Sequence, residues 1–89
     1  MPTVTIPTPL RPHTGGRDRL EAAGATVGEV LENVAKDHPA LRDRIFDGAE
    51  LRQYVNVYVN NEDIRYIDDL ATAVADRDQI DIIPAIAGG

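Results

Sequence analysis

Hydrophobic and polar residues alternate over several short segments of the chain, a pattern typical of β-strands with one buried face. Five segments are predicted to form strands: residues 3–6, 17–22, 52–59, 64–66 and 79–83. In the first strand, Val4 and Ile6 should face the core. In the second, Leu20 and Ala22 should do the same. Three prolines and a Gly-Gly pair predict a long loop over residues 7–16, so the first two strands should form a hairpin with a wide connection.

The segment 52–59 is the clearest of these strands, and its two faces differ. One face carries Val55, Val57 and Val59, and the other carries Tyr54, Asn56 and Tyr58. The valine face should pack against a helix. The Tyr-Asn-Tyr face is a candidate partner surface, because tyrosine combines an apolar ring with a polar hydroxyl. Pairing of these side chains across the sheet is the alternative that the pattern leaves equally open.

One segment follows the period of an α-helix. Thr26 followed three residues later by Glu29 is the signature of a capping box at a helix start. Apolar residues then recur from Val27 to Val34 at the spacing of a single helix face. Valines are weak helix formers, so this helix should depend on packing against the sheet. Pro39 marks its end, and a short turn of helix followed by a loop is expected after it.

Polar turns should connect the remaining elements. Residues 60–63 predict a turn in which asparagine tolerates positive φ, and residues 68–74 predict a short connection rather than a full helix. Residues 76–78 should form the turn into the last strand. Their paired carboxylates indicate no metal site, because a calcium loop needs more ligands at regular spacing. At Pro84 strand pairing should stop, since proline has no N–H to donate.

The element order predicts an α+β fold. A strand hairpin, a crossover helix and a second group of strands indicate one mixed sheet of four to five strands with one main helix across one face. Parallel pairing of the first and last strands would make them central, which is the β-grasp or ubiquitin-like arrangement. We expect a single domain over residues 1–84, followed by a flexible C-terminal diglycine tail over residues 85–89.

Composition excludes several classes of function. The 89 residues include no cysteine, which excludes disulfides, thiolate metal sites and a cysteine nucleophile. The net charge of −6 argues against nucleic-acid binding. No apolar run approaches membrane-spanning length and no signal peptide is evident, so a cytoplasmic protein without a membrane partner is expected. His13 lies in the predicted loop without a visible catalytic partner.

The last residues of the chain carry the candidate chemistry. The segment that would thread into a partner consists of Pro84, Ala85, Ile86, Ala87, Gly88 and Gly89. The carboxylate of Gly89 is the reactive group of this tail, and the two glycines have no Cβ to obstruct a narrow channel. We interpret this carboxylate as the working group of the protein. A frayed terminus without function is the alternative.

Several motifs resemble the ThiS/MoaD family of ubiquitin-like sulfur carrier proteins. They are Leu70-Ala71-Thr72, Asp76-Arg77-Asp78-Gln79-Ile80, Ile83-Pro84 and Ala87-Gly88-Gly89. The segments 6–8, 10–16 and 55–60 are similar to those of the actinobacterial CysO branch, which serves cysteine biosynthesis. One departure is Arg77, which stands where many relatives have glycine and leaves the type of this turn open.

The resemblance implies a protein co-substrate rather than an enzyme. A ubiquitin-activating-like enzyme would adenylate Gly89 with ATP, and a sulfur donor would convert the adenylate to a thiocarboxylate. The thiocarboxylate would supply sulfur to a PLP-dependent cysteine synthase, and a zinc-dependent peptidase would release the cysteine. ATP and PLP would belong to these partners, with no cofactor or metal bound to the chain itself.

Three alternatives remain at this point. A sibling carrier would supply sulfur for thiamine, molybdopterin or thiosugar biosynthesis. A ubiquitin-like protein modifier would join Gly89 to lysines of target proteins. A β-grasp interaction module would have a tail without function, so that removal of Gly88 and Gly89 would leave its activity intact.

Overall fold

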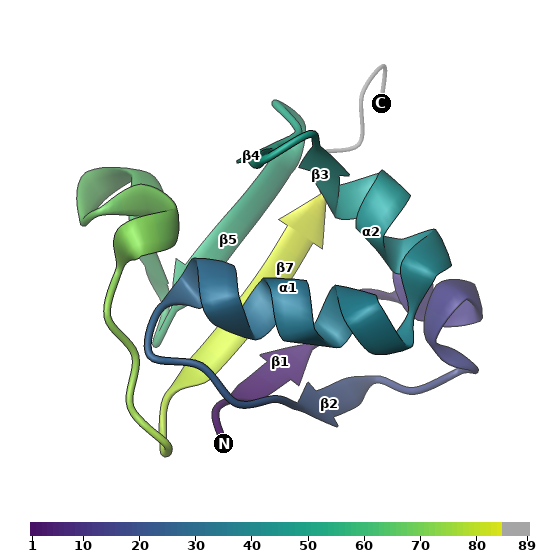
Figure 1. Ribbon diagram of the computed structural model, residues 1–89, viewed down its shortest axis with the longest axis horizontal. Coiled ribbons are helices and arrows are strands. Elements are labelled where there is room, and N and C mark those ends of the chain that lie inside the picture. The colour runs from purple at the N-terminus through teal and green to yellow at the C-terminus, as the bar shows by residue number, and fades with distance from the viewer. Residues whose placement is uncertain (85–89) are drawn as a thin grey trace.

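Five strands form one mixed sheet in the order β2-β1-β7-β5-β6 (Figure 1). The computed structural model describes residues 1–84, without the side chain of Pro84. The strands are β1 (Thr3–Thr5), β2 (Arg19–Glu21), β5 (Val55–Val59), β6 (Glu62–Asp63) and β7 (Gln79–Pro84). β1 and β7 are parallel, and the other neighbours are antiparallel. The predicted α+β architecture, with β7 in the centre of the sheet, is confirmed.

The main helix, α1 (Val27–Asp37), crosses one face of this sheet (Figure 1). Its start is capped as predicted, because the hydroxyl of Thr26 accepts a hydrogen bond from the N–H of Glu29 at 3.2 Å. The carboxylate of Glu29 accepts from the N–H of Ala25 at 3.2 Å, one residue before the position expected in a capping box. Both bonds satisfy N–H groups that have no partner within the helix.

The segment after α1 is more ordered than the sequence suggested. A second helix, α2 (Pro39–Ile45), follows directly, and a small hairpin of β3 (Phe46–Asp47) and β4 (Glu50–Leu51) replaces the expected loop. Pro39 therefore ends one helix and also begins the next, where its missing N–H has no cost. Only a short turn of helix was predicted here, whereas α2 extends from Pro39 to Ile45.

The prediction of a long loop over residues 7–16 was wrong. The proline-rich segment forms a 3-10 helix, η1 (Thr8–Thr14), rather than an open loop. The buried hydroxyl of Thr14 closes this turn, within hydrogen-bonding distance of the carbonyls of Arg11, at 3.1 Å, and Arg17, at 2.9 Å.

The segment predicted as a strand at residues 64–66 is a second 3-10 helix, η2 (Ile64–Tyr66). The carboxylate of Asp63 accepts a hydrogen bond from the N–H of Arg65 at 2.9 Å, which favours a helical turn over an extended strand. A third such helix, η3 (Asp69–Ala71), lies in the connection that was predicted to be short. The turn before β6 has positive φ at Asn60 and Asn61, as predicted.

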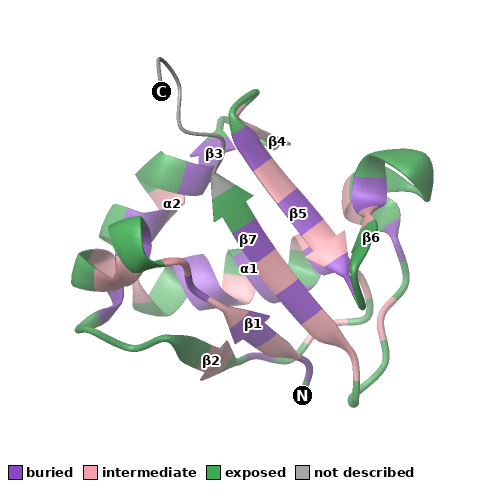
Figure 2. Ribbon diagram, turned by 180° about the vertical axis from the view of Figure 1, so that it is seen from behind, coloured by how far each residue is buried: buried purple, intermediate pink, exposed green. Residues whose placement is uncertain are grey.

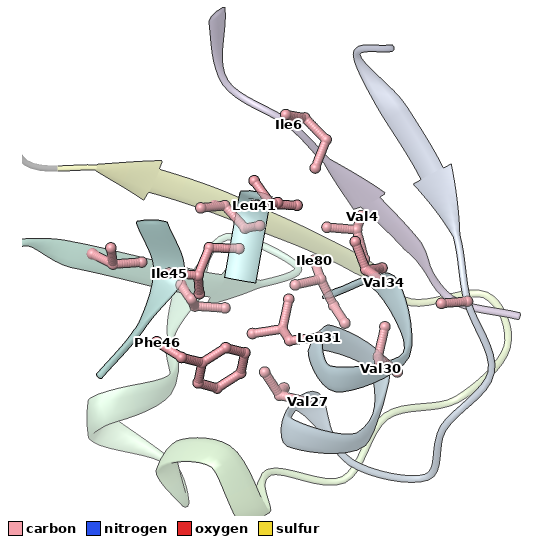
Figure 3. Packing of buried hydrophobic residues seen from close by; sticks show 14 of the residues in the cluster. Val4, Ile6, Val27, Val30, Leu31, Val34, Leu41, Ile45, Phe46 and Ile80 are labelled. Atoms are coloured by element: carbon pink, nitrogen blue, oxygen red, sulfur yellow. The ribbon is translucent and has the colours of Figure 1, made fainter. Parts of the chain in front are cut away.

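A mostly aliphatic core lies between α1 and the sheet (Figure 3). The residues buried there include Val4, Ile6, Val27, Val30, Leu31, Val34, Leu41, Ile45, Phe46, Val55, Val57, Val59, Ile80 and Ile82. Every apolar position predicted to face the core from the first strand, the helix and the valine face is in this set. From the second strand, Ala22 is buried and Leu20 packs against the cluster while partly exposed.

The last strand includes Pro84, opposite Val55 of β5, so pairing reaches the proline rather than ending before it. The backbone carbonyl of Asp78 accepts a hydrogen bond from the N–H of Thr3 in β1, and the backbone carbonyl of Gln79 accepts one from the N–H of Asn60, next to β5. Backbone groups alternate along a strand, so even-numbered residues of β7 are directed toward β1. The nitrogen of Pro84 is therefore on the side where β1 has already ended, and no ladder bond is lost there.

The chain passes close to α1 at Gly24, and this close contact can be tested. A Cβ at Gly24, where φ is 155°, would lie 2.7 Å from both Cγ2 and the backbone nitrogen of Val30. We expect Gly24→Ala to lower the free energy of unfolding by roughly 1–3 kcal/mol, measured by urea denaturation. Gly48→Ala is the matched control, because its φ of 66° is also positive but no atom lies within 4 Å of the added carbon. Equal losses for the two variants would contradict the close approach at Gly24.

Candidate functional site

The site begins where β7 ends. Parallel pairing with β1 extends to Thr5 opposite Asp81, and antiparallel pairing with β5 extends to Val55 opposite Pro84. The carboxyl end of β7 is thus paired on one side only, with β5, because β1 has already ended. The predicted working positions Ala85, Ile86, Ala87, Gly88 and Gly89 lie outside the described residues. Their predicted roles therefore remain predictions.

The face of the sheet opposite α1 is turned toward the viewer in Figure 2, and the alternation of β5 places Asn56 and Tyr58 of the candidate tyrosine surface on it. Asn56 and Tyr58 lie on this open face and are half-buried, while Tyr54 precedes β5 and is 43% exposed. In the register of the sheet, Asn56 is opposite Ile83 and Tyr58 is opposite Asp81. These side chains therefore have cross-strand neighbours and still reach the surface, and their role as a partner surface stays a prediction.

Ile83 belongs to this open face, and sequence reasoning assigned it only to a strand. Its side chain is 48% exposed, whereas the neighbouring Ile82 is buried. Alternation along β7 contained the signal, because burial of Ile80 and Ile82 directs residues 81 and 83 to the opposite face. The open face thus offers an exposed apolar side chain next to the last described residue.

A small polar network joins the two parallel strands on the open face. The side-chain amide of Gln79 donates to the hydroxyl of Thr5 and to the carboxylate of Asp81, the latter at 3.2 Å. A groove of about 460 Å³ lies beside it, between β7 and the start of η1. Its lining includes Pro7, Arg11 and Ile83. The carboxyl end of β7 therefore adjoins an apolar groove on one side and the tyrosine strand on the other.

The turn before β7 explains how Arg77 replaces glycine. The N–H of Asp78 donates to the carbonyl of Ala75 at 3.0 Å, and Arg77 does not have a positive φ. The turn therefore does not need glycine at this position. The carboxylate of Asp78 accepts from the N–H of Ala75 at 2.8 Å and from the side-chain amide of Asn60 at 3.1 Å. These bonds, with a smaller effect of Arg77, hold the pKa of Asp78 below its ordinary value despite a small opposing effect of burial.

Among residues 1–84, no three histidine, cysteine, aspartate or glutamate side chains gather as metal ligands. The backbone itself forms the predicted turn at residues 76 and 77, directly before β7. His13 makes no hydrogen bond through its side chain to the described part of the chain. No helix in the described structure has both the length and the hydropathy needed to cross a membrane.

This arrangement defines a ubiquitin-like β-grasp protein, in which a helix crosses a mixed sheet and the C-terminal strand is central. A protein-family model described as the ThiS family matches residues 4–89. The chain belongs to the ThiS family, and the resemblance inferred from its motifs is confirmed.

Similar proteins agree with this assignment. Over 90 residues the chain is 46% identical to sulfur carrier protein CysO of Mycobacterium tuberculosis, covering 98% of this chain and 97% of the relative. The crystal structure of the Amycolatopsis orientalis BexX/CysO complex contains a chain that matches with a TM-score of 0.93 and 45% identity, with 100% of both chains covered. Small archaeal modifier protein 3 of Haloferax volcanii is 35% identical over 65 residues, covering 73% of this chain and 71% of the relative.

The lowered pKa of Asp78 predicts a specific dependence of stability on pH. The contribution of this carboxylate is fully present above the ordinary pKa of 3.8 and is lost as pH falls through the lowered pKa of the folded state. We expect Asp78→Asn to be less stable than the unmodified chain near neutral pH, with the difference shrinking below about pH 4. Thermal unfolding followed by circular dichroism across this range measures the difference.

The control for this experiment is Glu62→Gln. Glu62 is exposed, and its carboxylate accepts no hydrogen bond from the described residues. Its substitution should leave the shape of the pH profile unchanged. A constant difference between Asp78→Asn and the unmodified chain from neutral to acidic pH would show that the charge of Asp78 contributes nothing.

Proposed function

We propose that this chain is a sulfur carrier whose working group is the carboxylate of Gly89, and that its sulfur is used to make cysteine. The observation that supports this most strongly is 46% identity over nearly the whole chain to a sulfur carrier protein CysO. The family match extends to Gly89 and so includes the complete diglycine motif. The central position of β7 adds a physical reason, because residues that follow it are attached to the most firmly paired strand.

The chemistry starts with activation of a poor electrophile. One oxygen of the Gly89 carboxylate attacks the α-phosphorus of ATP, and pyrophosphate leaves, so that an acyl adenylate forms. A donor that delivers sulfur at the oxidation level of hydrosulfide then attacks the carbonyl carbon. AMP leaves with the electron pair of the broken bond, and a thiocarboxylate remains at the end of the tail. Splitting the reaction in this way replaces one difficult displacement by two easier steps.

The thiocarboxylate then gives up its sulfur. Its sulfur would add to the β-carbon of an α,β-unsaturated substrate held in a PLP-dependent cysteine synthase; the carbon–carbon π bond would break and the α-carbon would take up a proton, which gives a thioester. Transfer of the acyl group to the neighbouring amine converts the thioester to an amide. Hydrolysis by a zinc-dependent peptidase releases cysteine and restores the carboxylate of Gly89.

In this sequence of reactions the chain is a co-substrate and not an enzyme. ATP, PLP and the catalytic side chains belong to the adenylating enzyme, the cysteine synthase and the peptidase. The carrier supplies a tail without obstructing side chains at Gly88 and Gly89 and a folded body that partners recognise. We assign a docking role to the open face around Tyr54, Asn56 and Tyr58, because two tyrosines and the exposed Ile83 offer amphipathic contact area there.

A protein modifier is the second candidate. The 35% identity to small archaeal modifier protein 3 favours it, although that match covers less of the chain than the match to CysO. In that function Gly89 would form an amide with lysine side chains of target proteins. Carriers for thiamine, molybdopterin or thiosugar biosynthesis share the same tail chemistry, and only the acceptor enzyme distinguishes them.

Mass spectrometry of the C-terminal fragment, isolated from the native cells, distinguishes these functions. A carrier is expected to show one oxygen of Gly89 replaced by sulfur, and the cysteine pathway is expected to show a tail with an added cysteine. The fragment is needed because oxidation of Met1 would change the intact mass by nearly the same amount. Tails found only in amide linkage to lysines of other proteins would contradict the carrier proposal and support the modifier.

A one-residue extension tests whether the free carboxylate of Gly89 is the working group. We expect addition of alanine after Gly89 to abolish adenylation, because the carboxylate is moved beyond the position that the adenylating enzyme can activate. ATP–pyrophosphate exchange measures the rate, and urea denaturation should show an unchanged fold. Full exchange by an extended chain that mass spectrometry shows to be untrimmed would refute this mechanism.

A further inference from the structure

A notch with two arginines lies next to the carboxyl end of β7. Its volume is about 490 Å³, and it is lined by His13, Ala40, Asp43, Arg44, Arg52 and Tyr54. These residues come from three separate parts of the chain, namely η1, α2 and the segment between β4 and β5. Figure 1 shows α2 and β4 gathered around the end at which β7 finishes. Because Tyr54 precedes Val55, which is paired with Pro84, this arginine notch borders the point where the tail begins.

The charges of the arginine notch contrast with those of the whole chain. The protein has a net charge of −6, yet two arginines and a histidine meet here with a single carboxylate, Asp43. Within residues 1–84 the ion pairs are Met1 with Asp76 and Arg42 with Glu32. Neither arginine of the notch therefore has a carboxylate partner in the described structure.

One of the two guanidinium groups is held in place. The Nε of Arg52 donates to the backbone carbonyl of Asp43 at 2.7 Å, so the position of this side chain is set by α2. Arg44 makes no hydrogen bond through its side chain to the described residues and is exposed. A fixed arginine beside an adjustable one, with the partly exposed ring of Tyr54 next to them, suits recognition of a planar carboxylate.

We propose that the arginine notch binds a carboxylate side chain at the mouth of the channel through which the adenylating enzyme receives the tail. This inference rests on the proposed function. The last residues of the tail have no polar side chains, so an enzyme that accepts a plain Gly-Gly carboxylate must identify the carrier by its body. The surface nearest the start of the tail is the part of the body that meets the channel mouth.

A protein carboxylate fits this notch better than a free phosphate does. Asp43 contributes a negative charge to the lining, which disfavours an anion with two or more charges. A single carboxylate can form two parallel hydrogen bonds with one guanidinium and still leave space beside Asp43. Contacts of this kind at the edge of an interface increase the rate of association and the selectivity for one partner.

The test compares two charge reversals that change the net charge equally. Arg44→Glu places a negative charge in the notch, and Arg77→Glu places one in the exposed turn before β7, at the opposite end of the strand. With the adenylating enzyme of the same organism, we expect Arg44→Glu to raise KM for the carrier about tenfold in ATP–pyrophosphate exchange without changing kcat. Arg77→Glu should change KM by less than about twofold. Arg44→Gln should lie between the unmodified chain and Arg44→Glu.

Control measurements separate the possible outcomes. The midpoints of urea unfolding of the Arg44 and Arg77 variants should equal that of the unmodified chain, so that a change in KM reports on binding and not on folding. Equal KM values for Arg44→Glu and Arg77→Glu would contradict the docking role of the arginine notch and would leave the sulfur-carrier proposal intact. Absence of exchange with the unmodified chain would instead overturn the proposed function itself.

A titration of the isolated chain with inorganic phosphate, at ionic strength matched with chloride, tests the competing ligand. We expect no saturable change in the NMR signals of Arg44, Arg52 and His13. Saturable shifts at these residues that Arg44→Glu abolishes would assign the notch to a small anion and overturn its role in docking.

Discussion

Pairing of β7 on both sides is the constraint on which the rest of this structure depends. The strand formed by the last described residues is parallel to β1 and antiparallel to β5, so the two ends of the sequence are joined in the middle of the sheet. Ile80 and Ile82 bring the same strand into the core beneath α1. Pairing of β1 with β7 joins positions far apart in the sequence, so it carries the entropic cost of closing a long loop. β7, the last strand of the described chain, is thus the central strand of the sheet.

The alternation that builds the core also builds the opposite surface. Burial of Ile80 and Ile82 places Asp81 and Ile83 on the open face, where they neighbour Tyr58 and Asn56 across the strands. A shift of register by one residue would bury the polar set and expose the valines, so the hydrophobic face and the open face are specified together. The position of Pro84 fits the same register, because its nitrogen is on the side that β1 no longer covers.

Elements with a strong periodic signal could be predicted from the sequence, and elements stabilised by single local contacts could not. The helix from Val27 and the strand predicted over residues 52–59 repeat their pattern over several residues; the helix agrees with the structure, and the strand agrees over Val55–Val59. η1 depends on the buried hydroxyl of Thr14 and η2 on the carboxylate of Asp63, and neither contact leaves a periodic trace. The carboxylate proposed as the working group was found from a terminal motif, whereas the arginine notch joins three distant segments and needs the fold to be seen.

The two ends of β7 differ in a way that agrees with a carrier function. The amino end of β7 adjoins two tight turns, one at Asn60 and one at residues 75–78. Around its carboxyl end the chain instead builds η1, α2 and the β3–β4 hairpin, which add a groove and a notch. These elements also complete the core, because Leu10, Leu41, Ile45 and Phe46 are buried in it. If the last residues carry no polar side chains and the catalytic groups belong to partners, the features that select a partner must lie on the folded body, and the groove and the arginine notch lie beside the carboxyl end of β7.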